Sequence, residues 1–500
     1  MFGSVHTNPS ANATRRMSGT LSQVAEGEGG ILHGTMTEPS RTDAGAILEV
    51  PPIATELGER FRLAGRQLYL VGGVVRDMLR GEVRPDAELD LATDAPPTET
   101  TRILRGWADR QYLVGVRFGT VGARRGDTIL EITTFREEVY RWEDRKPVVS
   151  FAKDLETDLS RRDFTINAMA VGLPDGVFVD PFGGVRDLAA RRLDTPLEPE
   201  IAFSDDPLRM LRAARFAAAL DVRPTPRVSR AIREMRERLW VVSAERISEE
   251  LSKLLVAPHV RTGLEIIVST GLAELFLPEL PALALEQDPV HRHKDVLKHT
   301  LAVVERCEPR LALRLAALLH DIGKPHTREI TSEGVQFHHH EVVGARMARE
   351  RLRALRYPSD LVEDVTRLVE MHLRFHGYSE WSDSAVRRYV RDAGHLLDDL
   401  NQLTRADCTT QNPVKAKQLA ALQDELEERI ARLAEEENLQ AMRPPLDGLE
   451  VMAHLGIEPG PLVGRALEHL MQLRLDLGPI DRDEALRRLD EWAAGQGLER

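Results

Sequence analysis

The 500-residue chain is longer than one hydrophobic core usually serves, and its length predicts three or four domains. A composition of 42% hydrophobic and 29% charged residues is that of a globular protein, and no run approaches the roughly 20 apolar residues that span a bilayer. The two cysteines, Cys307 and Cys408, are far apart, which favours a reducing compartment such as the cytoplasm and excludes a structural Cys-rich zinc site. The net charge of −13 excludes a globally basic nucleic-acid binder but leaves room for a local basic surface.

The first 200 residues divide into a leader and a mixed α/β segment. Residues 1–45 are rich in Ser, Thr, Gly and Asn, and we expect them to form a disordered leader, with Met36 as a candidate start. In residues 46–200, short β-branched runs alternate with helical stretches. The runs 120–124 and 129–135 are separated by Arg125-Gly126-Asp127, which predicts a β-hairpin. Beyond residue 200 helical spacing dominates.

A two-glycine turn follows the first strand of this α/β segment. Residues 68–77 predict a strand, a turn at Gly72-Gly73 and a helix that ends before Gly81. Such a turn lets backbone N–H groups approach a triphosphate, and Arg76 lies one helical turn further along. The alternative is a tight strand-to-helix turn with a purely structural role.

Acidic residues follow in the next predicted strand. The two-residue period of a strand places Glu88 and Asp90 on one face, with Leu89 and Leu91 on the other. Hard oxygen ligands of this kind suit Mg²⁺, and nucleotidyl transfer by two metal ions needs such carboxylates. Glu131, in a later strand, is a candidate third carboxylate. The alternative is an exposed acidic face.

Basic residues and an aspartate begin two later segments. Arg162 is a candidate phosphate ligand, and the neighbouring Asp163 is a candidate helix cap. Asp206 precedes a proline that starts a helix, and one face of that helix carries Arg209, Arg212 and Arg215. The alternatives are a simple N-cap and a solvated stripe of arginines.

Asp206 and Arg209 also match the hydrogen-bonding edges of two bases. Cytosine and adenine present an amine donor beside a ring-nitrogen acceptor, whereas uracil and guanine present the reverse polarity. A carboxylate accepts from the amine and a guanidinium donates to the ring nitrogen. The pair therefore predicts selection of C and A without a nucleic-acid template.

These segments, in this order, resemble the class II tRNA nucleotidyltransferase and bacterial poly(A) polymerase family, over roughly residues 50–495. The wider sequence, including residues 318–325, looks closest to the actinobacterial CCA-adding branch. The resemblance implies an α+β fold. It would have a polymerase-β-like nucleotidyltransferase head (46–200), an all-α neck that binds the base and RNA (201–285), an HD domain (286–412) and a helical body and tail (413–500).

The same resemblance implies roles for the residues above. It makes Gly73, Arg76 and Arg162 nucleotide ligands, Glu88 and Asp90 Mg²⁺ ligands, and the helix with Asp206, Arg209, Arg212 and Arg215 the nucleotide-binding helix. The implied reaction adds C, C and A to the tRNA 3′ end from CTP and ATP and releases pyrophosphate. The family usually has Asp where this chain has Glu88, and Asp86, on the same strand parity, is a candidate substitute.

The helical part resembles HD-domain phosphohydrolases. His299, the pair His320-Asp321 and Asp407 occur in the order in which those proteins bring ligands to one metal ion. Imidazole and carboxylate together suit a divalent transition metal better than magnesium. The intervening His338, His339, His340 and His372 are candidate further ligands or phosphate-binding groups.

Two other functions remain open at this point. A template-independent poly(A) polymerase shares the head motifs but uses ATP repeatedly. An HD-domain phosphohydrolase with the head reduced to RNA binding is favoured only by Glu88. A non-catalytic scaffold is disfavoured because complete motifs are present in both parts.

Overall fold

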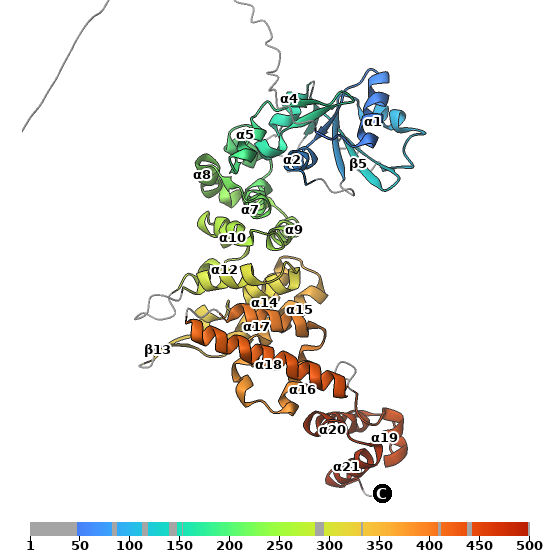
Figure 1. Ribbon diagram of the computed structural model, residues 1–500, viewed down its shortest axis with the longest axis vertical. Coiled ribbons are helices and arrows are strands. Elements are labelled where there is room, and N and C mark those ends of the chain that lie inside the picture. The colour runs from blue at the N-terminus through green and yellow to red at the C-terminus, as the bar shows by residue number, and fades with distance from the viewer. Residues whose placement is uncertain are drawn as a thin grey trace, which may run out of the picture. The chain divides into compact units, whose positions relative to one another are not determined.

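The computed structural model describes residues 48–82, 88–112, 119–139, 148–152, 154–285, 295–331, 334–408, 412–437 and 443–498. The leader predicted for residues 1–45 and the candidate ligand Asp86 lie outside these ranges. The described residues form a mixed α/β head followed by helices, as the sequence predicts (Figure 1). In the described part, no helix combines the length and apolar character needed to cross a bilayer.

A mixed sheet organises the head. Its strand order is β3-β4-β5-β2-β1-β8-β9, in which β2 and β5 are parallel and the other neighbours antiparallel. The predicted hairpin is confirmed as β4 and β5, with Gly126 at a φ of 57° in the turn. The strands are β1 (Leu68–Val71), β2 (Leu89–Thr93), β3 (Arg110–Tyr112), β4 (Thr120–Arg125), β5 (Thr128–Thr134), β8 (Ala170–Leu173) and β9 (Val177–Val179).

Helices cover this sheet and bury its apolar positions. The head contains α1 (Pro52–Leu63), α2 (Gly73–Arg80), α3 (Pro97–Leu104), α4 (Leu155–Ser160), the 3₁₀ helix η2 (Thr165–Asn167), α5 (Gly184–Ala189) and a small β6 (Arg136–Val139) and β7 (Val148–Phe151) ribbon. Leu57 and Phe61 of α1 are fully buried. Because Leu89 and Leu91 are buried in the same core, the opposite face of β2 presents Asp90.

The neck is helical, with a two-residue β10 (Arg192–Leu193) and β11 (Arg223–Pro224) bridge. Its helices are α6 (Pro199–Asp205), α7 (Leu208–Leu220), α8 (Pro226–Met235), α9 (Ala244–Leu255), α10 (Val260–Ser269) and α11 (Ala273–Phe276). Helices α7 and α10 pack closely: a Cβ on Gly263 would lie 2.8 Å from the carbonyl oxygen of Ala214. The small residues of α7 therefore face the neck core.

The body continues the hydrophobic core of the neck. It comprises α12 (Val296–Arg306), α13 (Leu311–Leu319), α14 (His340–Ala354), α15 (Ser359–Met371), α16 (Asp383–Ala393), α17 (Leu397–Asp407) and α18 (Pro413–Glu437). A hairpin of β12 (Arg328–Thr331) and β13 (Gly334–Phe337) departs from the helical pattern predicted beyond residue 200. The hairpin is short, and its Ile330 is exposed, so it gave no buried-strand pattern.

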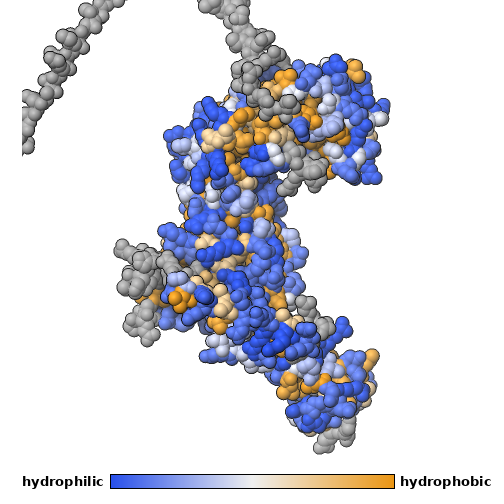
Figure 2. Space-filling model, viewed as in Figure 1, coloured by the Kyte–Doolittle hydropathy of each residue, from blue (hydrophilic) through white to orange (hydrophobic). Residues whose placement is uncertain are grey.

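The tail has a core of its own. Its helices α19 (Gly448–Leu455), α20 (Pro461–Leu477) and α21 (Arg482–Gly495) bury Val451, Leu470 and Leu489 against one another. On the face shown in Figure 2, hydrophilic residues cover most of the helical part, and a hydrophobic area lies over the α/β head.

Candidate active site and metal cluster

The two-glycine turn brings the backbone close to two charged side chains. Gly72 has φ 77° and ψ −142°, a conformation open only to glycine. A Cβ there would lie 3.0 Å from Nη1 of Arg162 and 3.4 Å from Oδ2 of Asp90. Gly73 then begins α2, so the positive end of this helix lies at the same turn.

Three carboxylates lie together at this end of the sheet. Asp90 of β2 is directly opposite Glu131 of β5 in the parallel register, and Glu88 immediately precedes β2. Burial, followed by Glu131 and Asp90, raises the pKa of Glu88. Burial also raises the pKa of Asp90, against the opposing effect of Arg162. Hard oxygen donors of this kind suit Mg²⁺, but the three carboxylates are not among the sets of described residues whose ligand atoms all lie within 4.8 Å of one another.

A cavity of about 430 Å³ lies beside Asp90 and joins the head to the neck. Its lining includes the predicted nucleotide ligands of both parts. The lining residues are Gly72, Gly73, Arg76, Asp90, Arg162, Asp163, Asn167, Asp206, Arg209, Arg212, Arg215 and Phe216.

Protein partners fix the two head arginines of this cavity. Arg76 donates to both oxygens of Asp77 and, at 2.7 Å, to Oδ1 of Asn167. Arg162 donates to the buried carboxylate of Asp158 at 3.2 Å. Both guanidiniums are thus oriented before any anion arrives, which reduces the entropy lost on binding.

Asp206 and Arg209 lie on the same cavity, at the start of α7. One oxygen of Asp206 accepts from the backbone N–H of Leu208 at 3.2 Å, as a cap does, and the other accepts from Arg246 at 2.9 Å. Arg209 donates to the carbonyl oxygens of Arg161 at 2.6 Å and Ala202 at 3.3 Å. Asp206 therefore accepts a backbone N–H at the start of α7 while also lining the cavity.

Arg212 and Arg215 do not form a solvated stripe, and that alternative is wrong. Arg212 donates twice to Asp163, at 2.5 and 3.0 Å, and Arg215 donates to Glu250 at 2.6 Å. The guanidinium carbons of Arg212 and Arg215 lie 5.5 and 4.0 Å from the ring centroid of Phe216. These contacts hold α7 against the head loop on one side and α9 on the other.

Asp163 plays a different part from the predicted helix cap. Its side chain does not cap η2; besides the pair with Arg212, it accepts from Nδ2 of Asn167 at 2.9 Å. Burial opposes its ionisation, yet Arg212 holds the pKa of this carboxyl below its usual value. Asp163 thus links the head to α7.

Several side chains of the site carry no signal in the sequence. They come from elements far apart along the chain and are of ordinary residue types. They are Asp158, Asn167, Phe216, Arg246 and Glu250.

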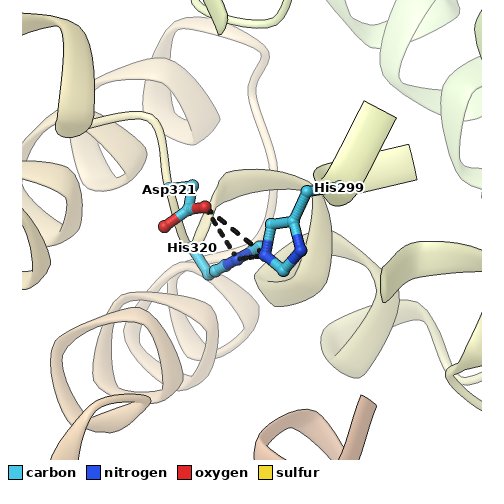
Figure 3. Close-up of side chains that lie close together, drawn as sticks. All are labelled: His299, His320 and Asp321. Atoms are coloured by element: carbon cyan, nitrogen blue, oxygen red, sulfur yellow. Dashed lines mark hydrogen bonds and ion pairs between the residues drawn. The ribbon is translucent and has the colours of Figure 1, made fainter. Parts of the chain in front are cut away.

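The predicted ligands of the body converge from three helices. His299 lies on α12, His320 and Asp321 directly follow α13, and Asp407 ends α17. Figure 3 shows His299, His320 and Asp321 with their side chains directed toward one another. The Nε2 atoms of the two histidines lie 3.3 Å apart, and Nε2 of His299 lies 2.9 Å from Asp407.

The charged groups of this cluster shift one another's pKa values. Burial opposes protonation of His320, but Asp321 and Asp407 raise its pKa to about 10. Burial likewise opposes ionisation of Asp321, yet His320 and Lys324 hold its pKa well below the usual range. The negative charges that raise the pKa of His320 would also attract a metal cation to these ligands.

Two further histidines lie against Asp321. His340 begins α14 and His372 follows α15; both are buried, and with Asp321 they form a second set of close ligand atoms. His338 and His339, also predicted as candidates, are exposed, and His338 instead contacts Gln336. His340 and His372 therefore join the cluster, whereas His338 and His339 do not.

Three family models match successive parts of the chain. Residues 68–194 match the "Poly A polymerase head domain", residues 221–283 the "Probable RNA and SrmB- binding site of polymerase A", and residues 296–454 the "HD domain". The chain is 35% identical to the A-adding tRNA nucleotidyltransferase of Deinococcus radiodurans, over 85% of this chain and 95% of that one.

Other relatives extend this similarity. The CC-adding tRNA nucleotidyltransferase of Thermus thermophilus is 33% identical, over 86% of this chain and 95% of its own. The CCA-adding enzyme of Bacillus stearothermophilus, solved in complex with CTP, shares the fold, with a TM-score of 0.65 and 24% identity over 90% of this chain and 99% of that one.

Proposed function

Because the chain belongs to the tRNA nucleotidyltransferase family, we propose that it adds C, C and A to tRNA 3′ ends from CTP and ATP and releases pyrophosphate. One observation carries the proposal. A single cavity contains the glycine turn, the carboxylate Asp90 and the base-matching pair Asp206 and Arg209. It therefore brings phosphate, metal and base recognition within reach of one nucleotide.

The head residues would bind the triphosphate and its ions. We assign the divalent metal to Glu88, Asp90 and Glu131, with Mg²⁺ as the ion that best suits carboxylate ligands. Bound there, Mg²⁺ would activate the terminal 3′-hydroxyl of the RNA and stabilise the departing pyrophosphate. The backbone at Gly72-Gly73, with Arg76 and Arg162, lines the cavity beside Asp90 and would hold the phosphates there.

Base selection falls to Asp206 and Arg209. Arg209 uses one N–H on each of two carbonyl oxygens and keeps further donors for a ring nitrogen. Asp206 accepts the exocyclic amine of cytosine or adenine once Arg246, which is half exposed, gives up its contact. Uracil and guanine would place an oxygen against Asp206 and a ring N–H against Arg209, and both contacts are unfavourable.

The remaining assignments follow the same proposal. We assign nucleotide transfer to residues 46–200, base and RNA binding to 201–285, the HD domain to 286–412 and the helical C-terminal part to 413–500. The body, α12 to α18, thus contains the HD domain and the first helix of the C-terminal part. The partner is tRNA. Two free cysteines, Cys307 and Cys408, support a reducing compartment, and we place the protein in the cytoplasm.

The body supports a second candidate activity, hydrolysis of phosphate esters. His299, His320, Asp321 and Asp407 offer a buried imidazole and carboxylate set that suits one divalent transition metal. This activity would accompany nucleotide transfer, since the two sets of residues do not overlap.

Extension of a tRNA that lacks its last three nucleotides tests the main proposal. With CTP, ATP and Mg²⁺, sequencing of the products should show CCA and no further residues. Addition of CC alone or A alone would match the named activities of the Thermus and Deinococcus relatives and would restrict the proposal to a partial reaction. Long adenosine tails would identify a poly(A) polymerase.

A further inference from the structure

We propose that a second anion-binding site lies where the head meets the neck, at a cavity of about 610 Å³ that shares no described lining residue with the nucleotide cavity. The guanidinium groups of Arg191, Arg192 and Arg223 line it and would bind the phosphate groups of a ligand. Such phosphates belong either to the backbone of an RNA or to a free polyphosphate, and both sources offer the same oxygens to the arginines.

This cavity lies at the opposite end of α7 from the nucleotide cavity. Asp206 and Arg209, at the start of α7, line the nucleotide cavity, whereas Asp221, directly after the helix, lines the second cavity. The helix has 13 residues and is therefore roughly 20 Å long. A ligand in the second cavity is thus either a separate molecule from the reacting nucleotide or a distant part of the RNA.

Two arginines of the cavity are paired across a short parallel bridge. Arg192 of β10 is the direct partner of Arg223 of β11, so both side chains project from the same face. Like charges in such positions repel each other and destabilise the pairing. Arg191 joins them, because its carbonyl oxygen accepts from the backbone N–H of Arg223 at 2.9 Å. A bound anion would relieve the repulsion.

These two arginines also keep their donors free. The side chain of Arg223 has no hydrogen bond or ion pair with any described residue. Arg192 lies 3.7 Å from Asp187 and 3.7 Å from Asp194, which is too far for a hydrogen bond. Both carboxylates have shorter contacts with other side chains, at 2.8 Å each. The two guanidiniums, with five N–H donors each, are therefore available to phosphate oxygens.

Arg191 and Asp221 give the cavity a strained rim. Each has a φ of 53°, in the left-handed region that a Cβ disfavours. Arg191, whose side chain is 72% exposed, donates to Asp221 at 2.5 Å. Asp221 is the one acidic side chain among the described lining residues. Strained residues of this kind are frequent at ligand sites, and a phosphate would replace Asp221 as the acceptor for Arg191.

Equilibrium binding to the double variant Arg192→Gln, Arg223→Ser distinguishes the two phosphate sources. A tRNA transcript without its last three nucleotides is bound on filters at several KCl concentrations. If the RNA backbone is the ligand, we expect Kd to rise about 10- to 30-fold and the slope of log Kd against log [KCl] to fall by about 1 to 2. If the ligand is a free polyphosphate, equilibrium dialysis should count one fewer inorganic triphosphate per chain than in the parent, with Kd for tRNA unchanged.

The control is Arg349→Ala, which removes an exposed arginine of α14 that has no described partner and does not line the cavity. It should match the parent in every reading. A double variant that also matches the parent in tRNA affinity, salt slope and triphosphate count overturns the site. Failure of CCA addition by the parent would leave these binding readings intact. If the double variant does not fold, Arg223→Ser alone decides, because that side chain has no described partner to lose.

Discussion

The nucleotide cavity and the metal cluster of the body differ in how open they are and in how their polar side chains are paired. In the cavity, Arg212 and Arg215 are paired with Asp163 and Glu250, and the site is open enough to give about 430 Å³ of space. In the body, His320, Asp321 and His372 are almost fully buried, and two imidazole nitrogens have no hydrogen bond among the described residues. The first arrangement suits a large anion that enters and leaves, and the second suits an ion that stays.

The donor atoms of the two regions differ in the same sense. The candidate metal ligands of the head, Glu88, Asp90 and Glu131, are all carboxylates, and Asp90 lines the cavity, whereas the cluster combines imidazole with carboxylate. Hard oxygen donors suit Mg²⁺, which exchanges readily, and imidazole suits transition metals, which bind more tightly. Each region should therefore respond to its own ion and to its own substitutions.

The largest expected effect is on nucleotide transfer. Asp90→Ala removes a ligand proposed to serve the metal at the reacting phosphate, and we expect kcat to fall on the order of 10³-fold or more. Binding of Mn²⁺ in the body should not change. The control is Asp127→Ala, which removes a fully exposed head carboxylate; retained transfer in Asp90→Ala would contradict the assignment.

A substitution in the body should have the reciprocal effect, loss of hydrolysis with nucleotide transfer retained. Asp321→Ala should lower hydrolysis of a simple phosphate ester about 100-fold or more, because it removes the ligand shared by both histidine groups. Nucleotide transfer should stay within about 2-fold of the parent, since Asp321 does not line the cavity. Loss of both activities with the fold intact would show that the two regions are coupled.

A smaller effect concerns selectivity within the cavity. Asp206→Ala removes the acceptor for the base amine, and we expect the preference for CTP and ATP over UTP and GTP, measured as a ratio of kcat/KM values, to fall about 10- to 100-fold. Arg246→Ala is the matched control, because it removes the partner of Asp206 but leaves the acceptor in place. If both variants keep the parental ratio, Asp206 does not select the base.

The smallest effect is on stability. Asp163→Ala breaks the pair with Arg212, and since Arg212 is one-third exposed we expect a loss of about 2–3 kcal/mol in chemical denaturation, below the range for a fully buried pair. Because the pKa of Asp163 is lowered in the folded protein, its contribution is present above the unfolded pKa of about 3.9. It is lost as the pH falls through the lower folded pKa. An unchanged free energy of unfolding at neutral pH would rule out this link.

Local motifs made the residues that line the cavity easier to predict than the residues that hold them in place. The turn at Gly72-Gly73 and the carboxylate Asp90 each lie within one short element, where strand period and backbone freedom decide their direction. The partners Asn167 and Glu250 depend on packing between distant elements, and the sequence contains no periodic signal for them. Asp163 was misread for that reason: its partner is on α7.

The histidine run of the body shows the same limit. The sequence marks residues 338–340 as equivalent candidates, but only His340 starts α14 and is buried. His339 has a φ of 58° and remains exposed. The choice among them depends on where the helix begins after the β12–β13 hairpin, and that hairpin was not predicted.

The nucleotide that each tRNA end accepts shows whether one cavity builds the whole CCA sequence. Three transcripts, ending before the first C, after one C and after both, are incubated with CTP alone and with ATP alone in Mg²⁺. We expect CTP to be added to the first two ends and ATP to the third, and we expect Asp90→Ala to abolish all three additions. Use of one nucleotide at only some of these ends, or repeated ATP addition at every end, would contradict a single cavity that builds the whole CCA sequence.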